Sequence, residues 1–417
     1  MRHCGLYAPC VCLCHRPARG PGSGDRLPPD QFQRRRAADM KITSIKSVMI
    51  QGSWTWTLIK VETDEGICGI GESQLPLGVP DILQRIEKMI VGEDPRNVIQ
   101  LAQKIYRGLS GAGSTGGSIL LAMSGVELAL WDLQGKITGL PLWQLLGGKY
   151  RDRVRIYADT GRPGDRSPEA YADGVRERVE AGYTVVKVDI DHCAPAEYIK
   201  DGHNRALSRQ EVDHMSAVSH AAFDALPDDV DLCLDLHWCY QTSDALRVAR
   251  RLEDIDILWL EDPTPPENLD ALKYVTDHTS VPIACGENHW MAHGLRPMIE
   301  QRAADIITPD IPRFGGIQEG KKVAELCEMH YLSFAPHNIC TPVGTVASAH
   351  VCANAPNFLA LEHHGLDCPW WDDIAANWSG PVVDRGYISL PDAPGIGVEL
   401  NEELLRAHLV EGEEWWD

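Results

Sequence analysis

Short apolar runs alternate with longer segments of helical spacing from Val154 onward. The runs are rich in Val, Ile and Leu, which is typical of parallel strands that are buried on both faces. Between them, apolar residues recur every three or four positions, as they do on one face of a helix. The alternation predicts a (β/α) barrel over residues 154–380. Its first strands are predicted at 156–158 and 183–190, its first helices at 167–181 and 210–225, and a long loop or inserted helix at 191–209.

The first part of the chain follows a different pattern. Residues 41–68 alternate apolar and polar positions, which predicts an antiparallel meander. Residues 82–109 and 118–136 have helical spacing, and a Gly-rich loop lies between them at 111–118. Strands followed by helices, without alternation, indicate a separate α+β domain at residues 40–153.

Two terminal segments complete the predicted domain organisation. Residues 1–39 are rich in Arg, Pro and Gly and lack periodicity, so we predict a disordered or non-native extension that precedes a natural start at Met40. The Pro-containing tail at 381–417 ends in acidic residues and Trp. It is predicted to leave the barrel and pack against the capping domain.

Three of the predicted barrel strands end in a carboxylate at equal spacing. Asp235, Glu261 and Glu287 each follow an apolar run, and 26 residues separate each from the next. A parallel strand with its crossover helix takes about that many residues, so these side chains fall at the same end of successive strands, where barrel active sites lie. Converging carboxylates repel one another unless a cation joins them, and Mg²⁺ prefers oxygen ligands. Any one of them alone could equally be a helix cap or a loop acid, but the equal spacing disfavours that alternative.

The overall charge excludes some partners. The 417 residues contain 39 Lys and Arg against 60 Asp and Glu, a formal net charge of −21. Such a surface disfavours nucleic acid and anionic membranes, and an anionic substrate would need a local positive site. No apolar run reaches about 18 residues, so no membrane span is expected. The 13 cysteines are odd in number and scattered, which favours a cytoplasmic location over a disulfide framework.

From about Lys41 to the end, the sequence resembles the enolase superfamily in its mandelate racemase-like branch, and most of all the sugar-acid dehydratases of the galactonate, gluconate and mannonate type. The matching runs lie at 122–133, 139–142, 260–263 and 285–287. The resemblance implies a TIM-type (β/α)7β barrel with an α+β capping domain that is built from the N-terminal part and the C-terminal tail. It also implies a homo-oligomer, and Mg²⁺ that is held by the three carboxylates and binds a substrate carboxylate.

The resemblance also indicates catalytic residues. Asp310 and His337 stand 27 residues apart, as in the family's His-Asp dyad, so His337 is predicted to be the base and Asp310 to orient it. His237 lies two positions after Asp235, and alternate residues of a strand share a face, so it is expected to reach the same cavity. The pattern Asp-x-His is similar to that of the dehydratases, in which this histidine protonates the leaving hydroxyl. Glu362 matches a glutamate that hydrogen-bonds the enediolate, for which it must be protonated. A purely structural or supporting role for either histidine is the alternative.

Substrate contacts are predicted at five further positions. Lys187 and Asp189 lie where the related racemases and cycloisomerases carry Lys-x-Lys, so the second base that racemisation needs is missing. Lys187 is expected to bind the substrate carboxylate or to form a structural ion pair, and the role of Asp189 stays open. Asn338 and Arg313 are weaker candidates. Trp54 lies where a mobile specificity loop is expected, although a core role is equally compatible with the sequence.

Together these features predict Mg²⁺-dependent dehydration of a sugar acid, an aldonate, to a 2-keto-3-deoxy sugar acid through an enediolate. Removal of a proton beside a carboxylate builds up a dianion, which a divalent cation in a dry site offsets, as in enolase-type sites. An epimerase, racemase or cycloisomerase on the same scaffold is the nearest alternative. A non-catalytic barrel protein is the alternative from another class. The sequence does not determine which sugar acid is the substrate.

Overall fold

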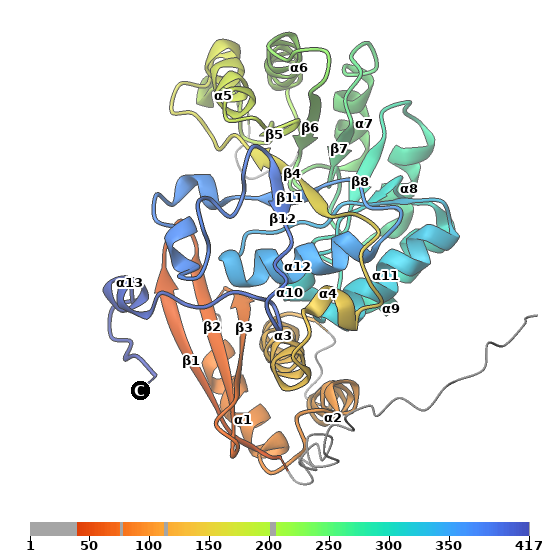
Figure 1. Cartoon of the computed structure of the whole chain (residues 1–417). Coiled ribbons are helices and arrows are strands. Elements are labelled where there is room, and N and C mark those ends of the chain that lie inside the picture. The colour runs from red at the N-terminus through yellow and green to blue at the C-terminus, as the bar shows by residue number, and fades with distance from the viewer. Residues whose placement is uncertain (1–39, 76–77, 112–115, 201–205, 417) are drawn as a thin grey trace, which may run out of the picture. The chain divides into compact units, whose positions relative to one another are not determined.

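The computed structural model of the chain describes residues 40–75, 78–111, 116–200 and 206–416 (Figure 1). The predicted extension at 1–39 lies outside these residues, as do parts of the predicted loops at 111–118 and 191–209. Within the described ranges, no helix combines the length and apolarity that a membrane span requires. The cysteines that belong to these ranges are all free thiols.

An antiparallel sheet and the helices after it form the capping domain. The sheet has the order β1 (Ile42–Gln51), β2 (Thr55–Thr63) and β3 (Cys68–Gln74). The helices are α1 (Val79–Ile90), α2 (Val98–Ser110) and α3 (Ser118–Thr138). The helical spacing at 82–109 therefore corresponds to two helices. The helical conformation is interrupted at 91–97, where Gly92 has a φ of 85° and Pro95 lies three residues later.

Helix α3 lies unusually close to β3 because the strand carries glycines. A Cβ atom on Gly69 would lie 2.0 Å from the carbonyl oxygen of Ala129, and one on Gly71 would lie 2.1 Å from that of Gly125. Such backbone contacts leave no room for a side chain. The packing fixes β3 against α3, and therefore fixes the position of the polar residues at the end of β3.

The second domain is a barrel of parallel strands with helices outside it (Figure 1). Its described strands are β4 (Arg153–Asp159), β5 (Val185–Asp189), β6 (Asp231–Asp235), β7 (Trp259–Glu261), β8 (Ile283–Cys285), β9 (Ile306–Ile307), β10 (Ser333–Phe334) and β11 (Leu361–His363). The helices between them are α5 (Pro168–Glu180), α6 (Arg209–Asp224), α7 (Thr242–Arg250), α8 (Leu269–Asp277), α9 (Met291–Gln301), α10 (Ile311–Phe314), α11 (Ile317–Met329) and α12 (Pro342–Asn354). Each strand pairs with the next, β11 pairs with β4, and a bridge from Phe334 to Phe358 closes the ring. The predicted (β/α)7β barrel with its α+β cap is confirmed.

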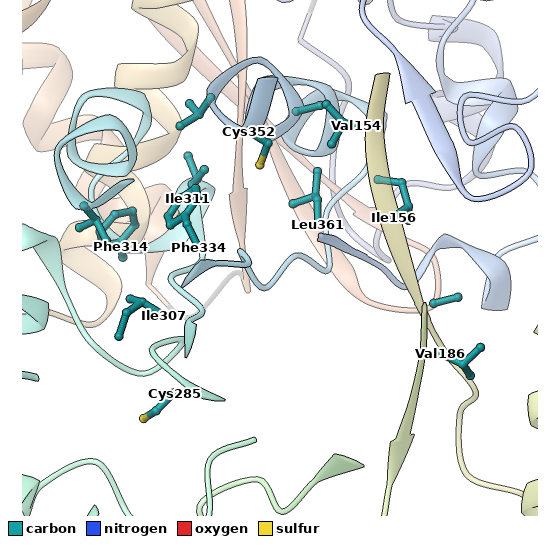
Figure 2. Close-up of a cluster of buried hydrophobic side chains, with 14 of the residues drawn as sticks. Val154, Ile156, Val186, Cys285, Ile307, Ile311, Phe314, Phe334, Cys352 and Leu361 are labelled. Carbon is teal, nitrogen blue, oxygen red and sulfur yellow. The ribbon is translucent and has the colours of Figure 1, made fainter. Parts of the chain in front are cut away.

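Alternate residues of the strands face opposite sides of the barrel wall. One set packs outward against the helices and includes Val154, Ile156, Val186 and Leu361 (Figure 2). The other set forms a separate apolar cluster inside the barrel: Tyr157, Val185, Cys233, Trp259, Ala284, Ile306, Ala335 and Ala360. The barrel interior is therefore packed at this level, and the site can begin only above it.

The tail returns to the capping domain, as expected. After β12 (Tyr387–Ser389), which pairs antiparallel with β4, the chain runs to α13 (Glu402–Ala407). Beyond α13, Leu409 forms a bridge with Ile50 of β1. Hydrogen bonds on either side of that bridge continue the pairing. The exact domain boundaries stay predictions.

Acid is expected to destabilise the fold through His350 of α12. This side chain is fully buried; Nδ1 accepts a hydrogen bond from the backbone N–H of Trp143 at 3.2 Å, and Nε2 donates to the carbonyl oxygen of Ile396 at 3.0 Å. Only the neutral ring has one acceptor and one donor. Burial lowers the pKa of His350 to about 4, whereas a histidine in an unfolded chain titrates near about 6.5.

Between those two pH values only the unfolded state takes up the proton. The contribution of His350 to stability is therefore complete above about pH 6.5 and is lost as the pH falls toward 4. Thermal unfolding from pH 7.5 to pH 4.5 should show a falling Tm in the wild type and a shallower fall in His350→Gln. The exposed His278 provides the control, since His278→Gln should keep the wild-type slope. Identical slopes in His350→Gln and the wild type would contradict this assignment.

Candidate active site

Polar side chains form a second inward-facing layer of the barrel. They lie two positions after members of the apolar interior cluster, on the same strands: Lys187, Asp235, Glu261 and Glu362. All are buried, and the strand register places Asp235 beside Glu261. Because alternate residues of a strand face the same side, one residue of a strand lies in the apolar core and the residue two positions later lies in the polar layer.

Lys187 is the central cation of this layer. Its Nζ lies 3.0 Å from Asp235 Oδ2, 3.9 Å from Glu261 Oε2 and 2.5 Å from Glu362 Oε1. Burial acts to lower the pKa of Lys187, but the three carboxylates outweigh it and raise the pKa well above its usual range. Of the two roles expected for Lys187, the ion pair is the one seen in the structure, with Asp235 and Glu362. Binding of a substrate carboxylate stays a prediction.

The three candidate metal ligands lie at the ends of successive strands. Asp235 and Glu261 are the last residues of β6 and β7, and Glu287 follows β8 by two residues. Their exposed fractions are 2%, 0% and 4%. Burial raises the pKa of Glu261 well above its usual range, and its Oε1 atom has no hydrogen-bond partner. A buried carboxylate oxygen without a partner is costly unless a cation binds it.

This donor set fits a hard divalent cation. Oxygen ligands with net negative charge are those that Mg²⁺ prefers. In the structure, Lys187 offsets part of that charge, and Glu287 Oε2 lies 2.7 Å from His337 Nε2. Among the described residues, the compact groups of candidate ligand atoms, within 4.8 Å of one another, do not include these three together. A cation would therefore draw them closer, and Mg²⁺ at this place stays a prediction.

His337 and Asp310 form a buried pair. His337 Nδ1 lies 2.6 Å from Asp310 Oδ2, and Nε2 points to the carboxylates of Glu287 and Glu362 at 2.7 and 3.7 Å. Burial acts to lower the pKa of His337, but Glu287, Glu362 and the hydrogen bond to Asp310 outweigh it and raise the pKa well above its usual range. These contacts favour the protonated ring. Because Glu287 is a candidate metal ligand, a cation bound to it would offset the first of the charges that raise this pKa and would leave Nε2 able to accept a proton.

The capping domain holds this pair from the other side. Gln74, the last residue of β3, donates a hydrogen bond from Nε2 to Asp310 Oδ2 at 2.6 Å. Glu72 is fully buried and accepts hydrogen bonds from the Thr341 backbone N–H at 2.8 Å and from its hydroxyl at 2.6 Å. Burial raises the pKa of Glu72 to about 7, against the effect of these hydrogen bonds. Two residues of one cap strand thus fix both the aspartate and the segment that follows His337.

His237 reaches the site by a route other than the one expected. Strand β6 ends at Asp235, and His237 and Trp238 have positive φ values of 41° and 47°, so a tight turn, not strand alternation, places the ring. The backbone N–H of His237 donates to Asp235 Oδ1 at 2.7 Å, which holds the turn over that carboxylate. Backbone conformations of this kind are strained for residues with a side chain, and they concentrate at functional sites.

Asp191 orients the ring of His237. Oδ1 of Asp191 lies 2.9 Å from His237 Nδ1, and Arg162 Nη2 lies 3.0 Å from both oxygens of that carboxylate. Burial acts to lower the pKa of His237, but Asp235 and the hydrogen bond to Asp191 outweigh it and raise the pKa to about 10. These contacts favour the protonated form of His237. Asp189 lies next to this pair: its Oδ1 is 4.0 Å from His237 Nε2, and its Oδ2 is 3.2 Å from Arg162 Nε. Burial together with the charge of Asp159 raises the pKa of Asp189 to about 8.

Comparison with known proteins places the chain in a family. The family described as Enolase C-terminal domain-like matches residues 170–404, and the family described as Mandelate racemase / muconate lactonizing enzyme, N-terminal domain, matches residues 34–147. The chain belongs to the enolase superfamily. Members of this superfamily use a divalent metal, which agrees with the acidic layer described above.

Several members of the enolase superfamily match nearly the whole chain. The chain is 41% identical to a D-xylonate dehydratase of Haloferax volcanii over 380 residues, which cover 91% of each protein. It is 30% identical to a D-galactonate dehydratase of Verminephrobacter eiseniae, over 90% of this chain and 96% of that protein. A crystal structure of a mandelate racemase/muconate lactonizing enzyme-like protein from Rubrobacter xylanophilus matches with a TM-score of 0.85 and 39% identity, over 89% of this chain and 98% of that one.

Glu362 differs from the expectation that the superfamily resemblance suggested. Its Oε1 lies 2.5 Å from Lys187 Nζ and 3.2 Å from His364 Nε2, and the hydroxyl of Tyr157 donates to Oε2 at 3.1 Å. Burial acts to raise the pKa of Glu362, but Lys187 and His337 outweigh it and hold the pKa well below its usual range. These contacts favour the carboxylate form, so the expected protonated acid is not the form that this arrangement stabilises.

The three remaining residues that were predicted to contact substrate differ in burial and in their hydrogen-bond partners. Asn338 is fully buried and donates both its amide hydrogen bonds within the protein, to Thr345 and to the Glu362 carbonyl oxygen. Arg313 donates to Asn288, the neighbour of Glu287 in the chain, at 2.9 Å and lies over the Trp290 ring. Trp54 is 39% exposed and meets His364 edge-on. Trp54 is therefore the most exposed of these three side chains.

Sequence reasoning missed five residues that surround the candidate site: Asp159, Arg162, Asp191, His364 and Gln74. Asp191 continues the alternation of Lys187 and Asp189, and His364 lies two positions after Glu362, so the period of two already pointed to both. Arg162 lies in the loop after β4, where no pattern identified it. Gln74 comes from another domain, and no periodicity in the barrel could indicate it.

Proposed function

We propose that the chain is a divalent-metal-dependent dehydratase of sugar acids, which converts an aldonate into a 2-keto-3-deoxy acid. The observation that carries the proposal is the presence of two histidines with an aspartate partner each, at the ends of β6 and β10. His337 with Asp310 serves as the base, and His237 with Asp191 serves as the acid. The 41% identity to a D-xylonate dehydratase supports the same reaction and makes a C5 aldonate the first substrate to test.

The proposed reaction is an elimination of water across C2 and C3. His337 Nε2 takes the proton from C2, the electron pair forms the C2–C3 double bond through the enediolate, and the C3–O bond breaks. His237 gives its proton to the departing hydroxyl, so water leaves. Tautomerisation of the resulting enol gives the 2-keto-3-deoxy acid. A divalent cation at Asp235, Glu261 and Glu287 would offset the charge that develops on the substrate carboxylate.

The residues are arranged for these roles by their surroundings. His237 with a pKa raised to about 10 carries its proton at neutral pH, as an acid must. Asp189 stands where a racemase would carry a second basic lysine, so one face of the substrate lacks a base. A dehydratase needs only one base, whereas a racemase needs two. Assembly into a homo-oligomer stays a prediction.

A panel of aldonates tests the function. With Mg²⁺ present, D-xylonate and D-galactonate should be turned over at different rates, and at least one should give a 2-keto-3-deoxy product, detected by ketone-specific derivatisation and by NMR. Exchange or epimerisation at C2 without any keto product, across the whole panel, would instead indicate the epimerase alternative. Absence of both reactions would favour a non-catalytic barrel.

Replacement of His237 by asparagine should separate the two chemical steps. Without the acid, loss of the C3 hydroxyl should slow by about 10²–10⁴-fold, while His337 still exchanges the C2 proton with solvent. Deuterium uptake at C2 of D-xylonate in D₂O measures the first step, and keto acid formation measures the second. His278→Asn, at an exposed position, controls for a general effect. Equal activity of His237→Asn and the wild type would exclude this histidine as the acid.

A further inference from the structure

A second cluster of metal-binding side chains lies beside the catalytic layer, in the loops that follow β5 and β6. It consists of Asp191, His192 and Cys239. Oδ2 of Asp191 lies 3.5 Å from His192 Nε2 and 3.9 Å from Cys239 Sγ, and the sulfur lies 3.8 Å from the imidazole nitrogen. The other oxygen of Asp191, Oδ1, holds His237.

These separations match one face of a tetrahedral zinc site. Zinc bonds of about 2.3 Å to sulfur and about 2.0–2.1 Å to nitrogen and oxygen, at the tetrahedral angle, separate sulfur from nitrogen or oxygen by about 3.6 Å and nitrogen from oxygen by about 3.4 Å. The three observed separations exceed these values by only about 0.1–0.3 Å. Small side-chain rotations would close that difference.

The backbone already holds the three ligands in place. The adjacent strands β5 and β6 bring their loops together, and the N–H of Asp191 donates to the carbonyl oxygen of Asp235 at 3.3 Å. His192 has a φ of 55°, and Arg166 holds its carbonyl oxygen. The turn at His237 and Trp238 directs Cys239 back toward the β5 loop. The ring of His192 is 60% exposed, which leaves room for water as a fourth ligand.

We propose that Asp191, His192 and Cys239 bind a thiophilic divalent cation such as Zn²⁺, at a site separate from the carboxylate triad. Thiolate and imidazole ligands select Zn²⁺ over Mg²⁺, whereas three carboxylates favour Mg²⁺. Binding releases the thiol proton to solvent. Arg162, which now contacts Asp191, keeps its separate contact with Asp189 through Nε at 3.2 Å when the cation takes Oδ2.

Cobalt titration tests the site, because Co²⁺ replaces Zn²⁺ and its bond to a thiolate gives a near-ultraviolet charge-transfer band. The titration uses the full chain with saturating Mg²⁺, which keeps cobalt from the carboxylates. Residues 1–39 contain four cysteines that can also bind cobalt. The diagnostic signal is therefore the difference between the wild type and Cys239→Ser. The absorbance due to one equivalent of bound Co²⁺ should be lost in Cys239→Ser. It should persist in Cys68→Ser, the control at a partly exposed cysteine of β3.

A second variant keeps the test independent of any folding effect at Cys239. His192→Gln lies on an exposed ring and should weaken cobalt binding at this site at least about tenfold, the loss typical of one ligand or its close support. His278→Gln, at another exposed histidine, should leave binding unchanged. Added Zn²⁺ should displace the band. Wild type and Cys239→Ser with the same band at every cobalt concentration, or His192→Gln with wild-type affinity, would overturn the proposal.

Discussion

His337→Asn is expected to lower kcat/KM for aldonate dehydration by about 10²–10⁴-fold, the usual contribution of a positioned general base. The imidazole of His337 directs Nε2 toward the carboxylate layer and has Asp310 behind Nδ1. Asparagine fills much of the same volume but cannot accept the C2 proton. Exchange of that proton with D₂O should fall together with turnover, which distinguishes His337 from a residue that acts only later.

The fold should survive this change. Asp310 keeps its 2.6 Å hydrogen bond from Gln74, so the buried aspartate is not left without a partner. Circular dichroism and thermal unfolding check this point, and His293→Asn, at an exposed histidine of α9, is the control. Wild-type deuterium uptake at C2 in His337→Asn would remove His337 as the base.

Removal of the divalent metal is expected to abolish dehydration, and added Mg²⁺ to restore it. Without a divalent cation, the second negative charge of the enediolate is left to Lys187, which already pairs with three carboxylates, and each 1.4 kcal/mol of lost stabilisation costs about tenfold in rate. Glu261→Gln should have a similar effect, since it removes one charge and one ligand from the site. The neutral amide keeps the volume and can still accept from Trp259 Nε1, which now donates to Glu261 at 3.0 Å.

Binding and catalysis can be measured separately for this variant. Mg²⁺ should raise the Tm of the wild type by binding to the native state, and it should raise that of Glu261→Gln much less. Glu267→Gln, at an exposed glutamate six residues later, should behave as the wild type. Full activity after exhaustive chelation, or a Tm that Mg²⁺ does not move in either protein, would contradict a metal-dependent mechanism.

Barrel, cap and the acidic layer were predictable from the sequence because each follows from a local rule. Apolar runs that recur with one helix between them specify parallel strands, and equal spacing places Asp235, Glu261 and Glu287 at one end of them. The tail was predicted to pack on the cap, but its partners on β1 could not be predicted, since this pairing joins residues more than 350 positions apart in the chain.

The parts that sequence could not predict depend on turns and on contacts between domains. His237 was expected on a strand face, but the strand ends at Asp235 and the chain turns at His237 and Trp238, which both have positive φ. Nothing in the sequence Asp-x-His-Trp predicts this turn. The charge on Glu362 depends on Lys187 of β5 and on His337, which follows β10. Burial alone suggested a protonated acid, and only the positions of the two cations reverse that expectation.

The contacts of β3 with Asp310 and with Thr341 have a consequence for efforts to change the substrate. Glu72 and Gln74 belong to the cap by sequence, but they contact the barrel at Thr341, four residues after His337, and at Asp310, the aspartate that pairs with His337. A chimaera that exchanges whole caps between relatives would thus alter proton transfer along with sugar preference. Grafting should be confined to the exposed loop around Trp54, with the β3 anchor left as it is, so that selectivity can be varied while the reactive groups stay aligned.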